Sequence, residues 1–118
     1  MEAPPLERRL AAILAADVEG DSRLMHGDEE ATMATLSAHR ALVDELIARH
    51  RGRIANTAGD SVLAEFASLL DAVRCAVEIQ AALQRANEDE PEGRGMRFRI
   101  GVNVGDVMVK DGDIFGTA

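Results

Sequence analysis

Two short segments of this 118-residue chain each end an apolar run with an aspartate. The first is Ala16-Asp17-Val18-Glu19-Gly20 and the second is Thr57-Ala58-Gly59-Asp60-Ser61. Mg²⁺ takes about six hard oxygen ligands, and it commonly binds one or two carboxylates together with substrate phosphates. If the two segments are neighbours in a sheet, Asp17 and Asp60 approach each other at one edge, and the Val18 carbonyl adds a third oxygen. The pair is therefore a candidate metal–phosphate site.

The residues after Asp17 suit a phosphate. Gly20 allows phosphate to approach the backbone closely, and residues 21–25 can expose backbone N–H groups at a helix start, which is a natural anion site. Two metal ions held there would activate a hydroxyl and neutralise a leaving pyrophosphate. From spacing alone, a pair of purely structural aspartates stays the simpler interpretation, because aspartates are common at strand ends and turns.

Composition limits what the chain can bind. Its length predicts a single domain, residues 1–118, and its three Phe with no Tyr or Trp predict an aliphatic core. The net charge of −8 argues against nucleic acid and anionic membranes as partners, but not against a nucleotide that arrives with Mg²⁺. The single Cys75 indicates a reducing compartment, and no apolar run reaches membrane-spanning length. We therefore expect a cytoplasmic protein without membrane insertion.

The first half of the chain predicts one ambiguous segment and one helix. Leu10–Ala16 suits either a helix, because of its alanines, or a buried central strand, because it is short and continuously apolar. Residues 28–50 predict a helix with Asp28 as N-cap and Gly52 as the C′ residue. Its apolar stripe comprises Met33, Leu36, Val43, Leu46 and Ile47, and His39 beside it is interpreted as a packed histidine.

The second half alternates strands with another helix. Residues 53–58 and 62–66 predict two strands whose turn places Asp60 at the hairpin tip. A helix begins at Ser68 in a capping-box pattern, with a predicted buried face of Leu69, Leu70, Val73, Ala76, Val77 and Leu83. Residues 96–104 alternate as an antiparallel strand that 107–109 continue, and an Asp-Gly turn leads into a last strand at 114–115. The order predicts an α+β, ferredoxin-like sheet with its helices on one face.

Four segments of the chain carry a resemblance to a known family. They are Leu14–Met25, Asn56–Phe66, Asp71–Gln80 and Phe98–Val107. In sequence and order they resemble the catalytic domains of bacterial class III adenylate/guanylate cyclases, from about Arg8 to Gly116. The resemblance implies the ferredoxin-like βααββαβ core of such a domain, truncated at the C-terminus, with a central strand before Asp17.

The resemblance also implies roles for individual residues. The metal positions, for two Mg²⁺ or Mn²⁺ ions, are Asp17, the Val18 carbonyl and Asp60. The nucleotide-binding positions are Gly20, Asp21, Ser22, Asn56, Gly59 and Asp113. In the family, the first three of these wrap the triphosphate, Asn56 and Asp113 match base-reading positions, and the active site lies between two subunits. The implied activity is conversion of Mg–ATP, or another nucleoside triphosphate, to a cyclic nucleotide and pyrophosphate in intracellular signalling, by a homodimer.

Three departures from the family pattern bear on activity. Asp21 stands where Phe or Tyr is usual and adds a negative charge beside the triphosphate, and Asn56 replaces a Lys. The chain also ends at Ala118, before the segment in which the family carries its transition-state Asn and Arg, so we expect little turnover from it alone. Two other functions stay open: a degenerate module that binds a nucleotide or a partner without catalysis, and a structural role with dimerisation through exposed strand edges.

Overall fold

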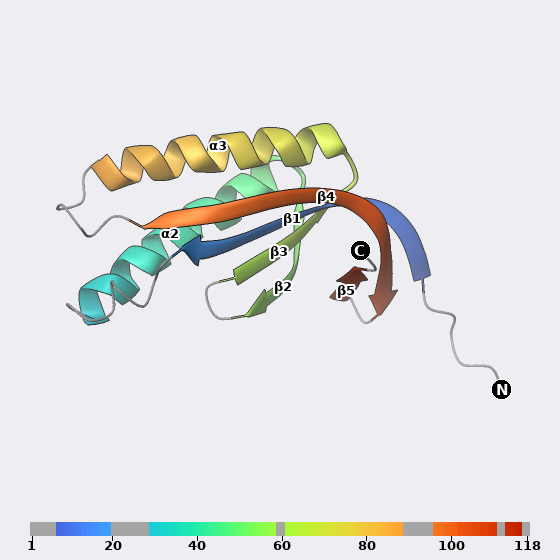
Figure 1. Ribbon diagram of the computed structural model, residues 1–118, viewed down its shortest axis with the longest axis horizontal. Helices are drawn as coiled ribbons and strands as arrows, with labels where there is room; N and C mark the ends of the chain where they lie inside the picture. The colour runs from blue at the N-terminus through green and yellow to red at the C-terminus, as the bar shows by residue number, and fades with distance from the viewer. Residues whose placement is uncertain (1–6, 20–28, 59–60, 89–95, 111–112, 117–118) are drawn as a thin grey trace.

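The computed structural model describes residues 7–19, 29–58, 61–88, 96–110 and 113–116. They form an antiparallel sheet with two long helices packed together against one face (Figure 1). The elements are β1 (Glu7–Glu19), α2 (Glu29–Arg49), β2 (Arg53–Ala58), β3 (Ser61–Phe66), α3 (Leu69–Glu88), β4 (Arg97–Lys110) and β5 (Asp113–Gly116). The strand order is β2-β3-β1-β4-β5. The predicted α+β architecture is confirmed.

The ambiguous segment before Asp17 is a strand, as the resemblance implies. β1 lies between β3 and β4, and every residue from Glu7 to Glu19 has a partner on β4. Leu14 and Ala16 point into the core beneath the helices and are almost fully buried. Pairing along both edges and burial of one face outweigh the helix preference of the alanines, because strand propensity depends mainly on surroundings.

Helix α2 confirms most of its predicted stripe. Val43, Leu46 and Ile47 are buried in the core, and so is His39, whose ring lies 6.3 Å from that of Phe98. Met33, by contrast, is half exposed near the beginning of the helix, where it was expected to be buried. The predicted N-cap, Asp28, lies outside the described residues.

The end of α2 differs from the prediction by one residue. Arg51, with φ of 67°, takes the left-handed C′ position, and its N–H donates to the Ala48 carbonyl while the Gly52 N–H donates to Ile47. This is a Schellman motif with Gly52 at C″ instead of C′. Gly52 is required for another reason: a Cβ there would stand 2.6 Å from ring carbons of Phe66.

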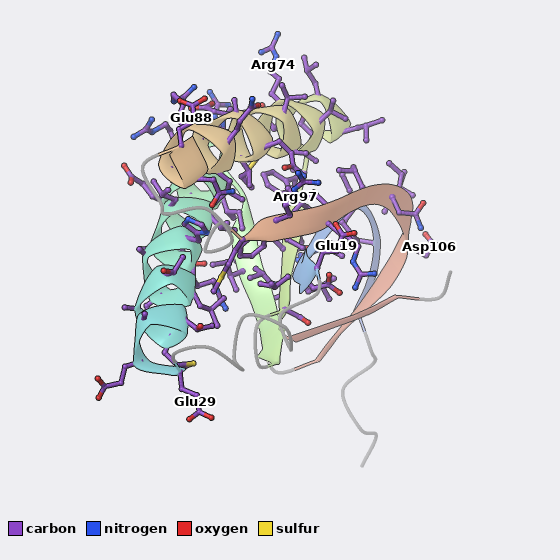
Figure 2. All side chains as sticks on the ribbon, turned by 60° about the vertical axis from the view of Figure 1, so that its left-hand side comes forward. Glu19, Glu29, Arg74, Glu88, Arg97 and Asp106 are labelled. Carbon is purple, nitrogen blue, oxygen red and sulfur yellow. The ribbon has the colours of Figure 1, made fainter. Side chains whose placement is uncertain are left out.

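The predicted buried face of α3 is largely wrong. Leu83 is buried as expected, but the other buried residues are Ala72, Cys75 and Ile79. Four expected core residues are instead exposed: Leu69, Leu70, Val73 and Val77. Both stripes have helical spacing, so periodicity alone does not decide which one faces the core. Figure 2 shows side chains along the outer side of α3, with Arg74 and Glu88 labelled.

Cys75 has no chemical role in this core. The thiol is fully buried, and burial, with a smaller contribution from Glu78, raises its pKa to about 11. Because the thiolate is the reactive form, such a thiol is inert near neutral pH.

Polar side chains form hydrogen bonds at both ends of α3 and at one position within it. The Ser68 hydroxyl accepts a hydrogen bond from the Asp71 N–H at 3.3 Å, which confirms the predicted cap. Gln80 donates to the Phe98 carbonyl at 3.0 Å. Asn87 makes two hydrogen bonds with the backbone of Met96, the residue before β4, and so connects the end of α3 to the start of that strand. Neither helix in the described part of the chain is long and apolar enough to cross a membrane.

Candidate functional site

Asp17 lies near the end of the central strand, on the sheet face opposite the helices. Its neighbours in β1, Ala16 and Val18, point into the core, so strand alternation turns Asp17 to the other side. Its cross-strand partner on β4 is Arg99. Arg99 Nε donates to Asp17 Oδ1 at 3.1 Å, and the second guanidinium nitrogen donates to Oδ2 at 3.4 Å. The side chains are 41% and 66% exposed, so this ion pair is open to solvent.

A shallow depression of about 490 Å³ adjoins this ion pair. Its polar end is formed by Asp17, Arg99 and Ser61, the first residue of β3. The remainder of its lining is apolar: Ala15, Ala16, Val62, Leu63, Ile100 and Gly101. Ala15 is the register partner of both Leu63 and Gly101, and a Cβ built on Gly101 would meet nothing within 4 Å. The short side chain of Ala15 and the absence of one at Gly101 therefore leave a depression beside Asp17 and Arg99.

The donor atoms at the polar end fit a hard divalent cation. Asp17 offers two carboxylate oxygens and Ser61 a hydroxyl, and oxygen donors of this kind are what Mg²⁺ prefers. After Ala16, β1 pairs with β4 but, in the described part of the chain, no longer with β3. The Val18 carbonyl therefore lies on a stretch of β1 whose edge on the β3 side is unpaired there. Asp60, which precedes Ser61 in the sequence, lies outside the described residues. Among those described, no three His, Cys, Asp or Glu side chains gather as a metal site.

The other predicted positions are only partly placed. Gly20, Asp21, Ser22 and Gly59 lie outside the described residues, as Asp60 does. The backbone of Asn56 lies in β2, next to a register irregularity, opposite Leu63. Asp113 begins β5 opposite Lys110. These are the two outer strands of the sheet, yet β2 and β5 contact each other because the far end of β4 curls over (Figure 1).

Arg99 is the functional candidate that sequence reasoning did not single out. The alternation of residues 96–104 places it only on the polar side of that strand. Register alone places it opposite Asp17, because the thirteen β1 residues pair without interruption with β4. An acidic residue near the end of one strand and an arginine near the start of another are a weak signal until that register is known.

A second ion cluster, Arg9–Glu65–Arg53, lies on the same sheet face. Glu65 of β3 accepts from Arg53 Nε at 3.1 Å and from a second Arg53 nitrogen at 2.7 Å. It also accepts from Arg9 Nε at 3.0 Å and from a terminal Arg9 nitrogen. Burial raises the pKa of the Glu65 carboxyl, but the hydrogen bonds and charges of the two arginines outweigh burial, so the pKa lies below its usual value. The cluster ties β1, β2 and β3 together and is structural.

The fold is similar to that of solved nucleotide cyclase domains. The structure resembles the crystal structure of an adenylate/guanylate cyclase/hydrolase from Silicibacter pomeroyi, with a TM-score of 0.85 and 47% identity, covering 95% of this chain and 66% of that one. It also resembles the crystal structure of the guanylyl cyclase Cya2, with a TM-score of 0.76 and 28% identity, over 89% of this chain and 58% of the other.

The chain also has a curated relative that is named as a cyclase. The chain is 49% identical over 112 residues to "Putative adenylate cyclase 3" of Rhizobium meliloti (strain 1021), covering 94% of this chain but 19% of that protein. No family model matches the chain. By sequence and fold together, the chain belongs to the class III adenylate/guanylate cyclases, which confirms the resemblance.

Proposed function

We propose that residues 1–118 form a cyclase-type catalytic unit that binds a divalent cation and a nucleoside triphosphate at the Asp17 end of the open sheet face. The observation that carries this proposal is the position of Asp17: a carboxylate at the end of the central strand, beside an arginine and above a depression of about 490 Å³. ATP is the first candidate substrate, with cyclic AMP and pyrophosphate as products, and cytoplasmic signalling is the setting that we expect.

The proposed site has a charged part that suits the phosphates of a nucleotide and an apolar part that suits the rest of the ligand. Arg99 presents a planar fork of donors that suits phosphate oxygens. Residues 20–22 would contribute backbone N–H groups to the same phosphates. The apolar part of the depression, around Ala15, Leu63 and Gly101, suits the less polar remainder of the ligand.

Asp17, the Val18 carbonyl and Asp60 would hold the metal, as Mg²⁺ or Mn²⁺. A bound cation would supply Lewis-acid stabilisation of the charge that develops on the phosphate chain. Asp21 opposes this arrangement, because its negative charge would stand beside the triphosphate.

We further propose that the working unit is a homodimer. The open face has no described helix over it, and Asn56 and Asp113, the proposed base-reading residues, are on the outer strands. A second copy against this face would place its base-reading residues opposite the Asp17 end of the first. Asn56 lacks the positive charge of the lysine usual at its position, so we expect base selection to be weak.

Calorimetry with Mg–ATP and Mg–GTP tests the binding site, and mass spectrometry of the products tests turnover. We expect measurable affinity that Asp17→Ala abolishes. Asp44→Ala is the matched control, because it removes a 42% exposed aspartate from a partly buried i,i+4 ion pair with Arg40 on α2. Equal affinities for wild type and Asp17→Ala would refute the site.

A second function is favoured by Asp21 and Asn56: a module that binds nucleotide without turning it over. Nucleotide affinity that depends on Asp17, with no cyclic product under Mg²⁺ or Mn²⁺, would identify this function. Cyclic product that disappears in Asp17→Ala would identify the catalytic one.

A further inference from the structure

We propose that the Asp17–Arg99 ion pair is a gate on the metal site: Arg99 competes with the divalent cation for Asp17 until a phosphate group draws the guanidinium away. The inference rests on the proposed metal site at Asp17 and adds a regulatory property to it. Metal and nucleotide would then bind with positive cooperativity, and free metal would bind weakly.

The geometry of the pair supports competition. Arg99 engages both carboxylate oxygens of Asp17, Oδ1 at 3.1 Å and Oδ2 at 3.4 Å. These are the oxygens that a cation at Asp17 would need. A metal ion that approached the occupied carboxylate would also meet the positive charge of the guanidinium. The cation and Arg99 therefore exclude each other at this residue.

The exposure of the pair makes it exchangeable. Arg99 and Asp17 are 66% and 41% exposed, and among the described residues neither forms an ion pair with any other side chain. An ion pair of this kind contributes little to stability, so it opens at low cost.

The Arg9–Glu65–Arg53 cluster on the same sheet face is the internal contrast. The Glu65 side chain is 9% exposed and is held by two arginines. The Glu65 carboxylate does not exchange its partners readily, because losing the arginines would leave a buried charge uncompensated. The difference in burial separates an exchangeable carboxylate from a structural one.

Phosphate is the group that would release the gate. Arginine binds phosphate and carboxylate through the same two-pronged geometry, so a nucleotide phosphate beside Asp17 offers Arg99 an equivalent partner. By thermodynamic linkage, a phosphate that draws Arg99 away raises metal affinity, and bound metal raises nucleotide affinity by the same factor.

The test is a titration with Mn²⁺ alone, read by the electron paramagnetic resonance signal of the free ion. We expect Arg99→Ala to tighten Mn²⁺ binding by roughly two- to fivefold, the factor that corresponds to losing an exposed ion pair. Arg99→Lys keeps the charge but not the two-pronged contact and is expected to fall in between. The same titration with a bound α,β-methylene ATP analogue should show no tightening in Arg99→Ala, because Arg99 has already left Asp17.

Arg97→Ala is the matched control. Arg97 lies two residues before Arg99 on the same strand and is the register partner of Glu19 (Figure 2). It carries the same charge but, within the described part of the chain, forms no ion pair with Asp17, so its removal reports the general electrostatic effect only. Circular dichroism of each variant confirms that the fold is retained.

The outcomes separate the gate from the metal site itself. If Asp17→Ala abolishes Mn²⁺ binding while Arg99→Ala matches Arg97→Ala, the gate is refuted and the metal site stands. If Asp17→Ala leaves Mn²⁺ binding unchanged, both the metal site and the gate are refuted. Tightening in Arg99→Ala that exceeds the control, and vanishes with the nucleotide analogue, supports the gate.

Discussion

Replacing Glu65 by glutamine should destabilise the fold measurably at neutral pH. The carboxylate is nearly buried and accepts four hydrogen bonds from Arg9 and Arg53. Removing one partner from a fully buried ion pair costs about 3–5 kcal/mol. Here the arginines are 41% and 45% exposed, so solvent screens the loss, and we expect about 1–3 kcal/mol. Glutamine keeps the size of the side chain, so the change isolates charge and hydrogen bonding from packing.

The effect of Glu65→Gln should depend on pH in a defined direction. The folded-state pKa of Glu65 lies below its unfolded value of 4.5. Its stabilisation is therefore fully present above the unfolded value and is lost as pH falls through the lower, folded-state pKa. Wild type and Glu65→Gln should accordingly differ most near pH 7 and converge in acid.

Urea unfolding followed by circular dichroism at several pH values measures both effects. Glu45→Gln is the matched control, because Glu45 pairs with Arg49 across one helical turn and both side chains are about 60% exposed. We expect the control to change the free energy of unfolding by less than about 0.5 kcal/mol. A loss in Glu65→Gln no larger than the control, or a difference that grows as pH falls, would refute this account of the cluster.

Two further predictions concern packing. Gly52→Ala should lower stability by about 1–3 kcal/mol, because the added Cβ would stand 2.6 Å from the Phe66 ring. Gly101→Ala should be nearly neutral, because its Cβ would have open space around it. Thermal unfolding of the two variants checks the contrast. Ile79→Ala should cost about 2–4 kcal/mol and Val77→Ser less than about 0.5 kcal/mol, because Ile79 is buried and Val77 is 66% exposed. Similar losses for Val77 and Ile79 in urea would mean that α3 is rotated from the orientation described.

The local elements could be predicted because each rests on short-range rules. The strand predicted at residues 96–104 and the Ser68 cap both depend on residues within a few positions of one another, and the structure bears them out. The Asp-Gly turn predicted before β5 lies outside the described residues. The rotation of α3 could not be predicted in the same way. Its two apolar stripes have the same period, and the choice between them is made by the shape of the sheet that receives the helix.

The sequence by itself placed Asp17 at the end of an apolar run, and its motifs indicated the family. Tertiary structure decided what surrounds that carboxylate. Register between strands more than eighty residues apart sets Arg99 against Asp17, and short side chains on neighbouring strands combine into the adjoining depression. The physical reason is that cross-strand pairs depend on register, and a shift of one residue turns every side chain to the other face. No local pattern around either residue carries that information.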